Sequence, residues 1–164
     1  QAEKGTAIHH FMQFCDFNNL KTFGVESEIT RLKEESFISQ SESENIDVEK
    51  IKRFISSKLF DNIIRNEYYR EHRFNILVEA KLLNKNDTSN EKLLIQGIID
   101  CFYIENDKAV VIDYKTDRIK NELEFIDKYK LQLQMYKHAV EKLFKIEVSD
   151  CYIYSFYLDK EIKL

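Results

Sequence analysis

An acid and a lysine directly follow a buried-type apolar run in "VVIDYKTD", residues 110–117. On a β-strand, Asp113 and Lys115 point to the same face, about 6.6 Å apart. A further acid, Asp100, lies in the preceding apolar segment, and hairpin pairing of the two segments could set it beside Asp113. Two adjacent carboxylates repel each other, which favours protonation of one or binding of a cation. Hard oxygen ligands of this kind suit Mg²⁺ or Mn²⁺.

A lysine beside such a site has a chemical use. An ammonium group can orient an attacking water and offset the negative charge that builds on a pentavalent phosphorus. The simpler interpretation is a strand end at which Asp113 and Lys115 form a solvated salt bridge. From these residues alone the simpler interpretation is favoured, because the Asp-x-Lys pattern is common.

The spacing of apolar residues, which predicts the elements that position these side chains, changes along the chain from helical to alternating. Apolar stripes at helical spacing predict a helix over 5–15 with Thr6 as its cap, a weaker helix over 25–35, and an amphipathic helix over 47–63. The polar stretch 36–46 is predicted to be a loop.

A meander of three strands is predicted next, followed by a long helix and a last strand. The strands are expected at 74–80, 93–104 and 109–115, with a turn-rich connection after the first and a tight "ENDK" turn after the second. Asn121 and Glu124 predict the start of the helix, and 151–158 reads as the last strand. The fold class is α/β: a sandwich with a central mixed sheet of about four strands flanked by helices, in the core order αβββαβ.

Composition indicates one soluble domain over residues 1–164, with 43% hydrophobic and 33% charged residues. The net charge of -4 argues against binding of nucleic acid by bulk electrostatics alone. Cys15, Cys101 and Cys151 form no CxxC pair, so we expect free thiols in a reducing cytoplasm and no cysteine-bound zinc or cluster. No apolar run is long enough to cross a membrane. The chain begins at Gln1, and we expect it to be part of a larger polypeptide.

Four short stretches carry a family resemblance. They are "GTAIHH" (5–10), "QGIID" (96–100), "DYKTD" (113–117) and "QLQMY" (132–136). In this order they resemble the nuclease domain of the RecB/AddA family, within the PD-(D/E)XK superfamily, and together they frame nearly the whole chain. The resemblance implies a restriction-endonuclease-like sandwich.

The resemblance also implies roles for five residues. His9, Asp100 and Asp113 match metal ligands, and the backbone carbonyl of Tyr114 matches a fourth. Lys115 matches the catalytic lysine. Without the resemblance, His9 reads more simply as a half-buried surface histidine.

Three further positions are candidates for DNA contact or support of the site. Gln132 and Tyr136 match a QxxxY element, and at i and i+4 they share one helix face. They could touch DNA or order the lysine, although Tyr136 reads equally well as a core residue. Glu71 resembles an acidic position of the family, and either supports the metal shell or pairs with Arg70 or Arg73.

The resemblance implies a Mg²⁺-dependent DNA exonuclease, with Mn²⁺ able to substitute. Its substrate would be a single-stranded DNA end, hydrolysed during double-strand-break resection and recombinational repair. The implied partners are the helicase region of the same parent chain and an AddB-like subunit, within an ATP-dependent helicase-nuclease. No GxxxxGK[ST] phosphate loop occurs in this chain, so the ATPase is expected elsewhere.

Two other interpretations stay open. One is a non-catalytic DNA-binding or regulatory module with nuclease ancestry, against which the intact acids and lysine speak. The other is a stand-alone restriction-like or CRISPR-associated nuclease. The latter usually carries a cysteine-bound cluster, for which this chain lacks the ligands.

Overall fold

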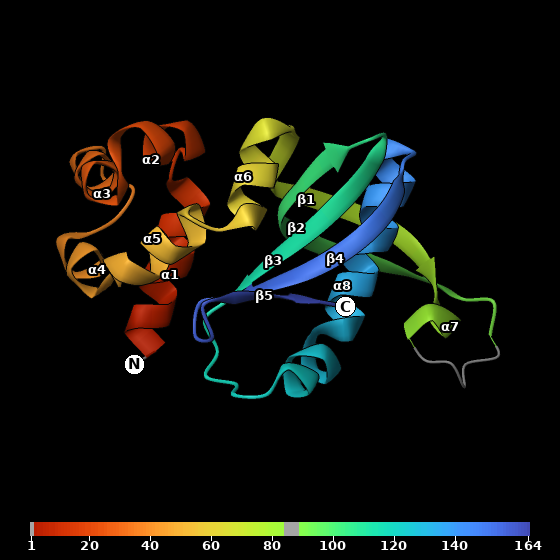
Figure 1. Ribbon diagram of the computed structural model, residues 1–164. Coiled ribbons are helices and arrows are strands. Elements are labelled where there is room, and N and C mark those ends of the chain that lie inside the picture. The colour runs from red at the N-terminus through yellow and green to blue at the C-terminus, as the bar shows by residue number, and fades with distance from the viewer. Residues whose placement is uncertain (1, 84–88) are drawn as a thin grey trace.

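The centre of the fold is a five-stranded mixed sheet with the strand order β1-β2-β3-β4-β5 (Figure 1). The computed structural model describes residues 2–83 and 89–164. The strands are β1 (Glu67–Glu79), β2 (Lys92–Glu105), β3 (Lys108–Lys115), β4 (Glu147–Ser155) and β5 (Lys160–Lys163). The β3–β4 pair is parallel and the other pairs are antiparallel. The predicted mixed sheet is confirmed, with β5 as one strand more than expected.

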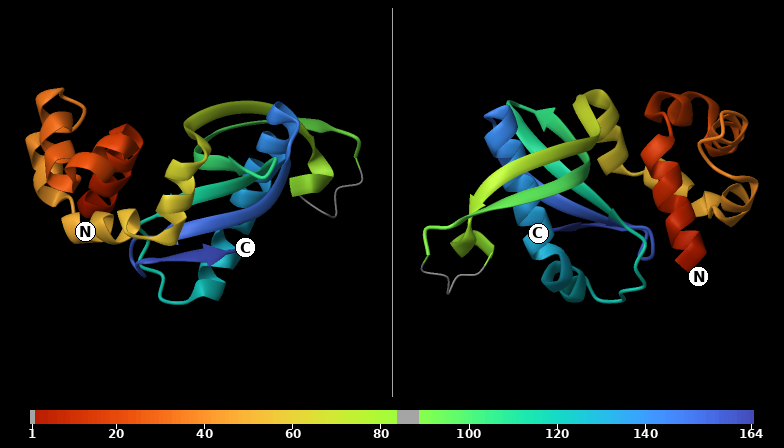
Figure 2. Two further views of the ribbon diagram at one scale, coloured as in Figure 1. Left: turned by 45° about the horizontal axis from the view of Figure 1, so that its top comes forward. Right: turned by 180° about the vertical axis from the view of Figure 1, so that it is seen from behind.

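Helices cover both faces of this sheet (Figures 1 and 2). In the described residues they are α1 (Ala2–Phe14), α2 (Phe17–Phe23), α3 (Val25–Glu34), α4 (Gln40–Asn45), α5 (Val48–Ile55), α6 (Lys58–Arg65), α7 (Ala80–Leu83) and α8 (Glu122–Phe144). One hydrophobic core joins the N-terminal helices to one face of β2, β3 and β4. A second core joins α8 to the opposite face. The predicted α/β sandwich is therefore confirmed.

Two predictions for the N-terminal half were wrong. The stretch 36–46, expected to be a loop, contains α4, which begins with a capping box between Ser39 and Glu42. The expected single helix over 47–63 is two helices, because the Ser57 hydroxyl accepts a hydrogen bond from the backbone N–H of Phe60 and starts α6.

Two other predicted boundaries can be compared with the structure. Thr6 lies inside α1 and is not its cap, because the helix already begins at Ala2. Asn121 caps α8 as expected, and its side chain accepts a hydrogen bond from the backbone N–H of Leu123.

The β2–β3 hairpin closes with a two-residue turn at Asn106 and Asp107. Their φ angles of 51° and 60° are left-handed, which is typical of the tight turns that match strand twist. The predicted hairpin is confirmed. Part of the turn-rich connection predicted between β1 and β2, residues 84–88, lies outside the described residues.

None of the helices in the described ranges has both the length and the apolar character that crossing a membrane requires.

Candidate active site

Three acids lie in a row across three neighbouring strands. The paired residues on either side leave Glu71 of β1 opposite Asp100 of β2. The β2–β3 ladder ends one step earlier, and continuing the same register places Asp100 opposite Asp113 of β3. The row therefore stands where regular strand pairing is interrupted.

The backbone is irregular at this row. Tyr69 and Phe74 both lie on the α8 side of β1, although strict alternation would put residues five apart on opposite faces. Ile99 and Phe102 of β2 show the same inversion. Between the first two residues, Glu71 has a φ of 49°, which is uncommon for a residue with a Cβ and costs conformational energy. The inversion reorients the acids of β1 and β2 relative to a regular sheet.

Asp113 is fully buried, and its carboxylate is poorly satisfied. Neither oxygen accepts a hydrogen bond of good geometry from the described residues. Lys115 Nζ lies 2.6 Å from Oδ2, close enough for an ion pair. Burial, followed by the charge of Asp100, raises the pKa of Asp113 to about 7, and the lysine opposes this shift. A buried carboxylate with free lone pairs is a natural cation ligand.

Asp100 is held by the backbone of β3. Its Oδ2 accepts a hydrogen bond of 2.8 Å from the N–H of Tyr114. The Tyr114 ring points the other way and is buried in the N-terminal core, 5.4 Å from the Phe54 ring. The side chain of Tyr114 thus packs in the core while its backbone N–H contacts Asp100, and the role of its carbonyl as a metal ligand stays a prediction.

His9 reaches the site from α1. Burial lowers the pKa of His9, and Lys115 adds to this, whereas the negative charge of Asp100 opposes it. The imidazole also contacts the backbone of Tyr114. The structure therefore brings the predicted histidine, both predicted aspartates and the predicted lysine into one neighbourhood.

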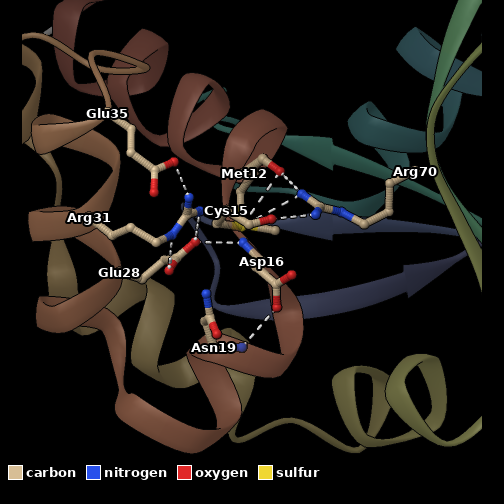
Figure 3. Close-up of polar contacts among 8 residues, drawn as sticks. All are labelled: Met12, Cys15, Asp16, Asn19, Glu28, Arg31, Glu35 and Arg70. Atoms are coloured by element: carbon tan, nitrogen blue, oxygen red, sulfur yellow. Dashed lines mark hydrogen bonds and ion pairs between the residues drawn. The ribbon is translucent and has the colours of Figure 1, made fainter.

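A half-buried arginine fixes the end of α1 to the sheet (Figure 3). Arg70, next to Glu71 on β1, donates hydrogen bonds to the backbone carbonyls of Met12 and Cys15. Its guanidinium also stacks 4.0 Å from the Phe17 ring centroid. These carbonyls lie at the C-terminal end of α1, where helix carbonyls lack partners within the helix. Arg70 thus ties the helix that carries His9 to the strand that carries Glu71.

The lysine is held by an aromatic residue of α8. Lys115 Nζ lies 4.5 Å from the ring centroid of Tyr129, and its side chain is only 12% exposed. The Tyr129 hydroxyl donates a hydrogen bond of 2.7 Å to Asp117, which also pairs with Lys128 at 2.7 Å. The "DYKTD" segment is therefore anchored to α8 on the side of the lysine.

Gln132 and Tyr136 contact each other on the face of α8 that turns to the sheet. The Gln132 amide donates a 2.8 Å hydrogen bond to the Tyr136 hydroxyl. Burial, followed by the charges of Asp113 and Asp100, raises the pKa of Tyr136. Tyr136 is only 7% exposed and packs edge-on against Phe74. It therefore belongs to the core and to the surroundings of the acids at once.

Glu71 faces the site. Burial, followed by the charge of Asp100, raises the pKa of Glu71 to about 7. Arg70 lowers that pKa only as a smaller effect, and within the described residues Glu71 makes no ion pair with Arg70 or Arg73. In the same residues no three His, Cys, Asp or Glu side chains converge closely enough to form a metal shell by themselves. The acids lie in a row, with one carboxylate left unsatisfied.

Arg70 and Tyr129 belong to this neighbourhood although the sequence does not indicate it. In the sequence, Arg70 reads only as a partner of Glu71, and Tyr129 only as a member of an apolar helix stripe. No short sequence pattern around Arg70 or Tyr129 indicates these roles, because each depends on contacts between residues far apart in the chain.

Comparisons with known proteins identify the family. The family model of the PD-(D/E)XK nuclease superfamily matches residues 1–162. An ATP-dependent helicase/nuclease subunit of Clostridium botulinum (strain Alaska E43 / Type E3) is 40% identical over 98% of this chain and 14% of its own length. The protein of the same name from Clostridium perfringens (strain ATCC 13124) is 34% identical over 99% of this chain and 14% of its own length.

The chain thus spans about one seventh of the length of these curated relatives. The solved structure of SSO0001 matches 96% of this chain over 64% of its own length, with 19% identity and a TM-score of 0.41. The match of the family model over almost the entire chain shows that this protein belongs to the PD-(D/E)XK nuclease superfamily.

Proposed function

We propose that this domain is a divalent-metal-dependent deoxyribonuclease that hydrolyses phosphodiester bonds of single-stranded DNA. The observation that carries the proposal is the fully buried Asp113, whose oxygens lack good hydrogen bonds and which stands in a row with two other acids. A buried carboxylate whose only partner is one ion pair, here with Lys115, still costs stability, and a cation would relieve that cost.

The donor types suit a hard divalent cation, which on binding would have to draw His9, Asp100 and Asp113 closer than they stand in the described residues. Nucleases of this superfamily generally use divalent metal ions. Asp100, Asp113, the Tyr114 carbonyl and the His9 imidazole would hold it, with Glu71 as a supporting acid. Oxygen ligands in this number favour Mg²⁺, for which Mn²⁺ can substitute. A bound divalent ion supplies Lewis-acid stabilisation of the charge that builds on the phosphorus.

Lys115 has the position of an electrostatic catalyst. Its ammonium lies at the exit of the acid row, held between the Asp113 carboxylate and the Tyr129 ring. From there it can donate a hydrogen bond to the attacking water or to a phosphate oxygen as negative charge develops. Its position is fixed before substrate arrives, so little reorganisation is needed during the reaction.

The wider role follows from the relatives. We propose that the domain acts as an exonuclease within an ATP-dependent helicase-nuclease that processes broken DNA ends for recombinational repair. A helicase region of the same parent chain and an AddB-like subunit would deliver the strand. The acidic balance of this chain supports that division, because a domain with net charge -4 binds DNA weakly without a guiding channel.

A cleavage assay tests the proposal. An end-labelled single strand is incubated with the wild type and with Asp113→Asn and Lys115→Met, in Mg²⁺, in Mn²⁺ and with chelator. We expect metal-dependent cleavage by the wild type that salt suppresses, and a loss of about three orders of magnitude in either variant. Lys33→Gln, which removes an exposed charge on α3, is the matched control and should cleave like the wild type.

Two results would overturn the proposal. Cleavage at equal rates by wild type and both variants would mean a contaminating nuclease. Tight DNA binding without any cleavage, in either metal, would instead support the non-catalytic DNA-binding module.

A further inference from the structure

A cavity of about 220 Å³ lies beside the candidate active site. It is lined by residues of α1, α5 and the segments that follow β3 and β4. These residues are Gly5, Ile8, Asp47, Lys50, Thr116, Arg118, Phe156 and Tyr157. Apart from the capping acid Asp47, its polar lining consists of two basic side chains and two hydroxyl-bearing ones.

Three connections fix this cavity next to the catalytic residues. Gly5 is one helical turn before His9 on α1, a rise of about 6 Å. Thr116 directly follows Lys115. The backbone N–H of Phe156 donates a 2.8 Å hydrogen bond to the carbonyl of Lys115. A ligand in the cavity would therefore lie within about one nucleotide of the acid row.

The close approach of α1 to the end of β3 closes one wall. A Cβ at Gly5 would lie 2.8 Å from the Thr116 hydroxyl oxygen, so any larger residue would force the Thr116 side chain to move. The opposite wall is clamped to α5. Lys50 donates to the Phe156 carbonyl, and Arg53 pairs with Asp159. These contacts fix the segment that carries Tyr157 before any ligand binds.

The cavity offers both an aromatic ring and a cationic side chain, a combination that fits a nucleotide. Tyr157 offers a half-exposed aromatic ring, with Lys50 Nζ 6.0 Å from its centroid. Arg118 is exposed, and its guanidinium makes no ion pair or hydrogen bond within the described residues. Asp47 is occupied as the cap of α5, where it accepts a hydrogen bond from the Lys50 backbone. An aromatic face beside a free guanidinium suits a base together with its phosphate.

We propose that this cavity is a subsite for one nucleotide of the DNA strand, adjacent to the scissile phosphate. The base stacks on Tyr157, and Arg118 pairs with the phosphate of the same nucleotide. The inference rests on the proposed nuclease function, because a nucleotide here is useful only if the neighbouring acids cut the strand. Such a subsite sets the position of the cut relative to a base that the domain grips.

Binding of a fluorescent single strand tests the subsite, read by anisotropy with chelator in an Asp113→Asn background that prevents cleavage. Tyr157→Leu should weaken binding roughly tenfold, whereas Tyr157→Phe keeps the ring and should change it little. Arg118→Gln should weaken binding and lower the slope of log K against log salt by about 0.7, the value for one phosphate contact. Lys33→Gln, the same charge change away from the cavity, is the control.

A scan with abasic strands locates the gripped base. One abasic position should weaken binding as much as Tyr157→Leu does, and should have no further effect in that variant, because both remove the same stacking contact. If circular dichroism shows that Tyr157→Leu does not fold, Arg118→Gln and the abasic scan with unaltered Tyr157 still test whether the cavity binds a nucleotide.

The two proposals fail in different ways. If the wild type cleaves but both cavity variants bind like Lys33→Gln and no abasic position matters, the subsite is wrong and the nuclease stands. If the wild type cleaves no strand in either metal, the nuclease proposal itself is wrong. The subsite then falls with it.

Discussion

Two buried carboxylates in this domain differ in how well they are hydrogen-bonded. Glu28 of α3 is 2% exposed and fully satisfied: its oxygens accept hydrogen bonds from the Asp16 backbone at 2.6 Å and from Arg31 at 2.5 and 2.9 Å (Figure 3). Asp113 of β3 is 0% exposed, yet its oxygens lack well-formed hydrogen bonds. The fold gives the first acid three well-formed hydrogen bonds and the second only an ion pair with Lys115.

The difference distinguishes a structural acid from one kept for a ligand. Glu28 ties the start of α2 to α3 and gains from every contact that it makes. Burial, followed by the charge of Asp100, raises the energy of ionised Asp113, and Lys115 offsets this only in part. Sites that bind cations commonly contain carboxylates that are energetically unfavourable until the cation binds. If this interpretation is right, the two acids should respond oppositely to neutralisation.

The largest expected effect on stability is at Glu28. Glu28→Gln should lower the free energy of unfolding by about 3 kcal/mol, because it removes the buried charge that pairs with the half-buried Arg31 and with the Asp16 backbone N–H. Urea unfolding at pH 8 measures it. Glu35→Gln removes the exposed partner of the same Arg31 and should cost less than about 1 kcal/mol. Equal losses of unfolding free energy in the two variants would mean that the buried Glu28 contributes no more than the exposed Glu35.

Metal binding should give the next largest effect. Mn²⁺ at a hundred times its dissociation constant should stabilise the wild type by about 2.7 kcal/mol. Thermal unfolding with and without Mn²⁺ measures the shift. Asp113→Asn should lose the shift, and Glu28→Gln should keep it although its starting stability is lower. A shift that survives Asp113→Asn would place the ion elsewhere.

A smaller effect of opposite sign is expected for Asp113→Asn without metal. Neutralising the buried carboxylate should raise the free energy of unfolding by about 1 to 2 kcal/mol at pH 8, since burial and the charge of Asp100 disfavour the ionised form more than Lys115 favours it. Chelator-treated samples are compared by urea unfolding. A clear loss of stability in this variant would mean that Asp113, like Glu28, is a structural acid.

The pH dependence of that difference is the finest test. The folded pKa of Asp113, about 7, lies above the ordinary value of 3.8, so the folded state holds more protons between those values. The stability that the folded state gains from keeping Asp113 protonated is therefore fully present below about pH 4 and is lost as pH rises through 7. Without metal, the advantage of Asp113→Asn should shrink as pH falls from 8 to 5. A constant difference across this range would contradict the raised pKa.

The sequence predicted the strands that carry Asp100 and Asp113, because dense β-branched runs and a turn signal are local. It also predicted α8 from its Asn121 cap. It did not predict the inversion at Glu71 or the anchoring by Arg70, since both arise from pairing between distant segments. The short helix α4 was missed because its sequence is polar on every side. The roles of the site residues remain predictions.

The placement of the candidate residues has a consequence for how the domain comes into being. His9 belongs to the layer on one face of the sheet, and Tyr136 to the layer on the other, with the acids between them. A ribosome delivers the first of these segments long before the last, and domains fold largely as units during synthesis. A growing chain is therefore unable to bring the candidate residues of both layers together until α8 has emerged.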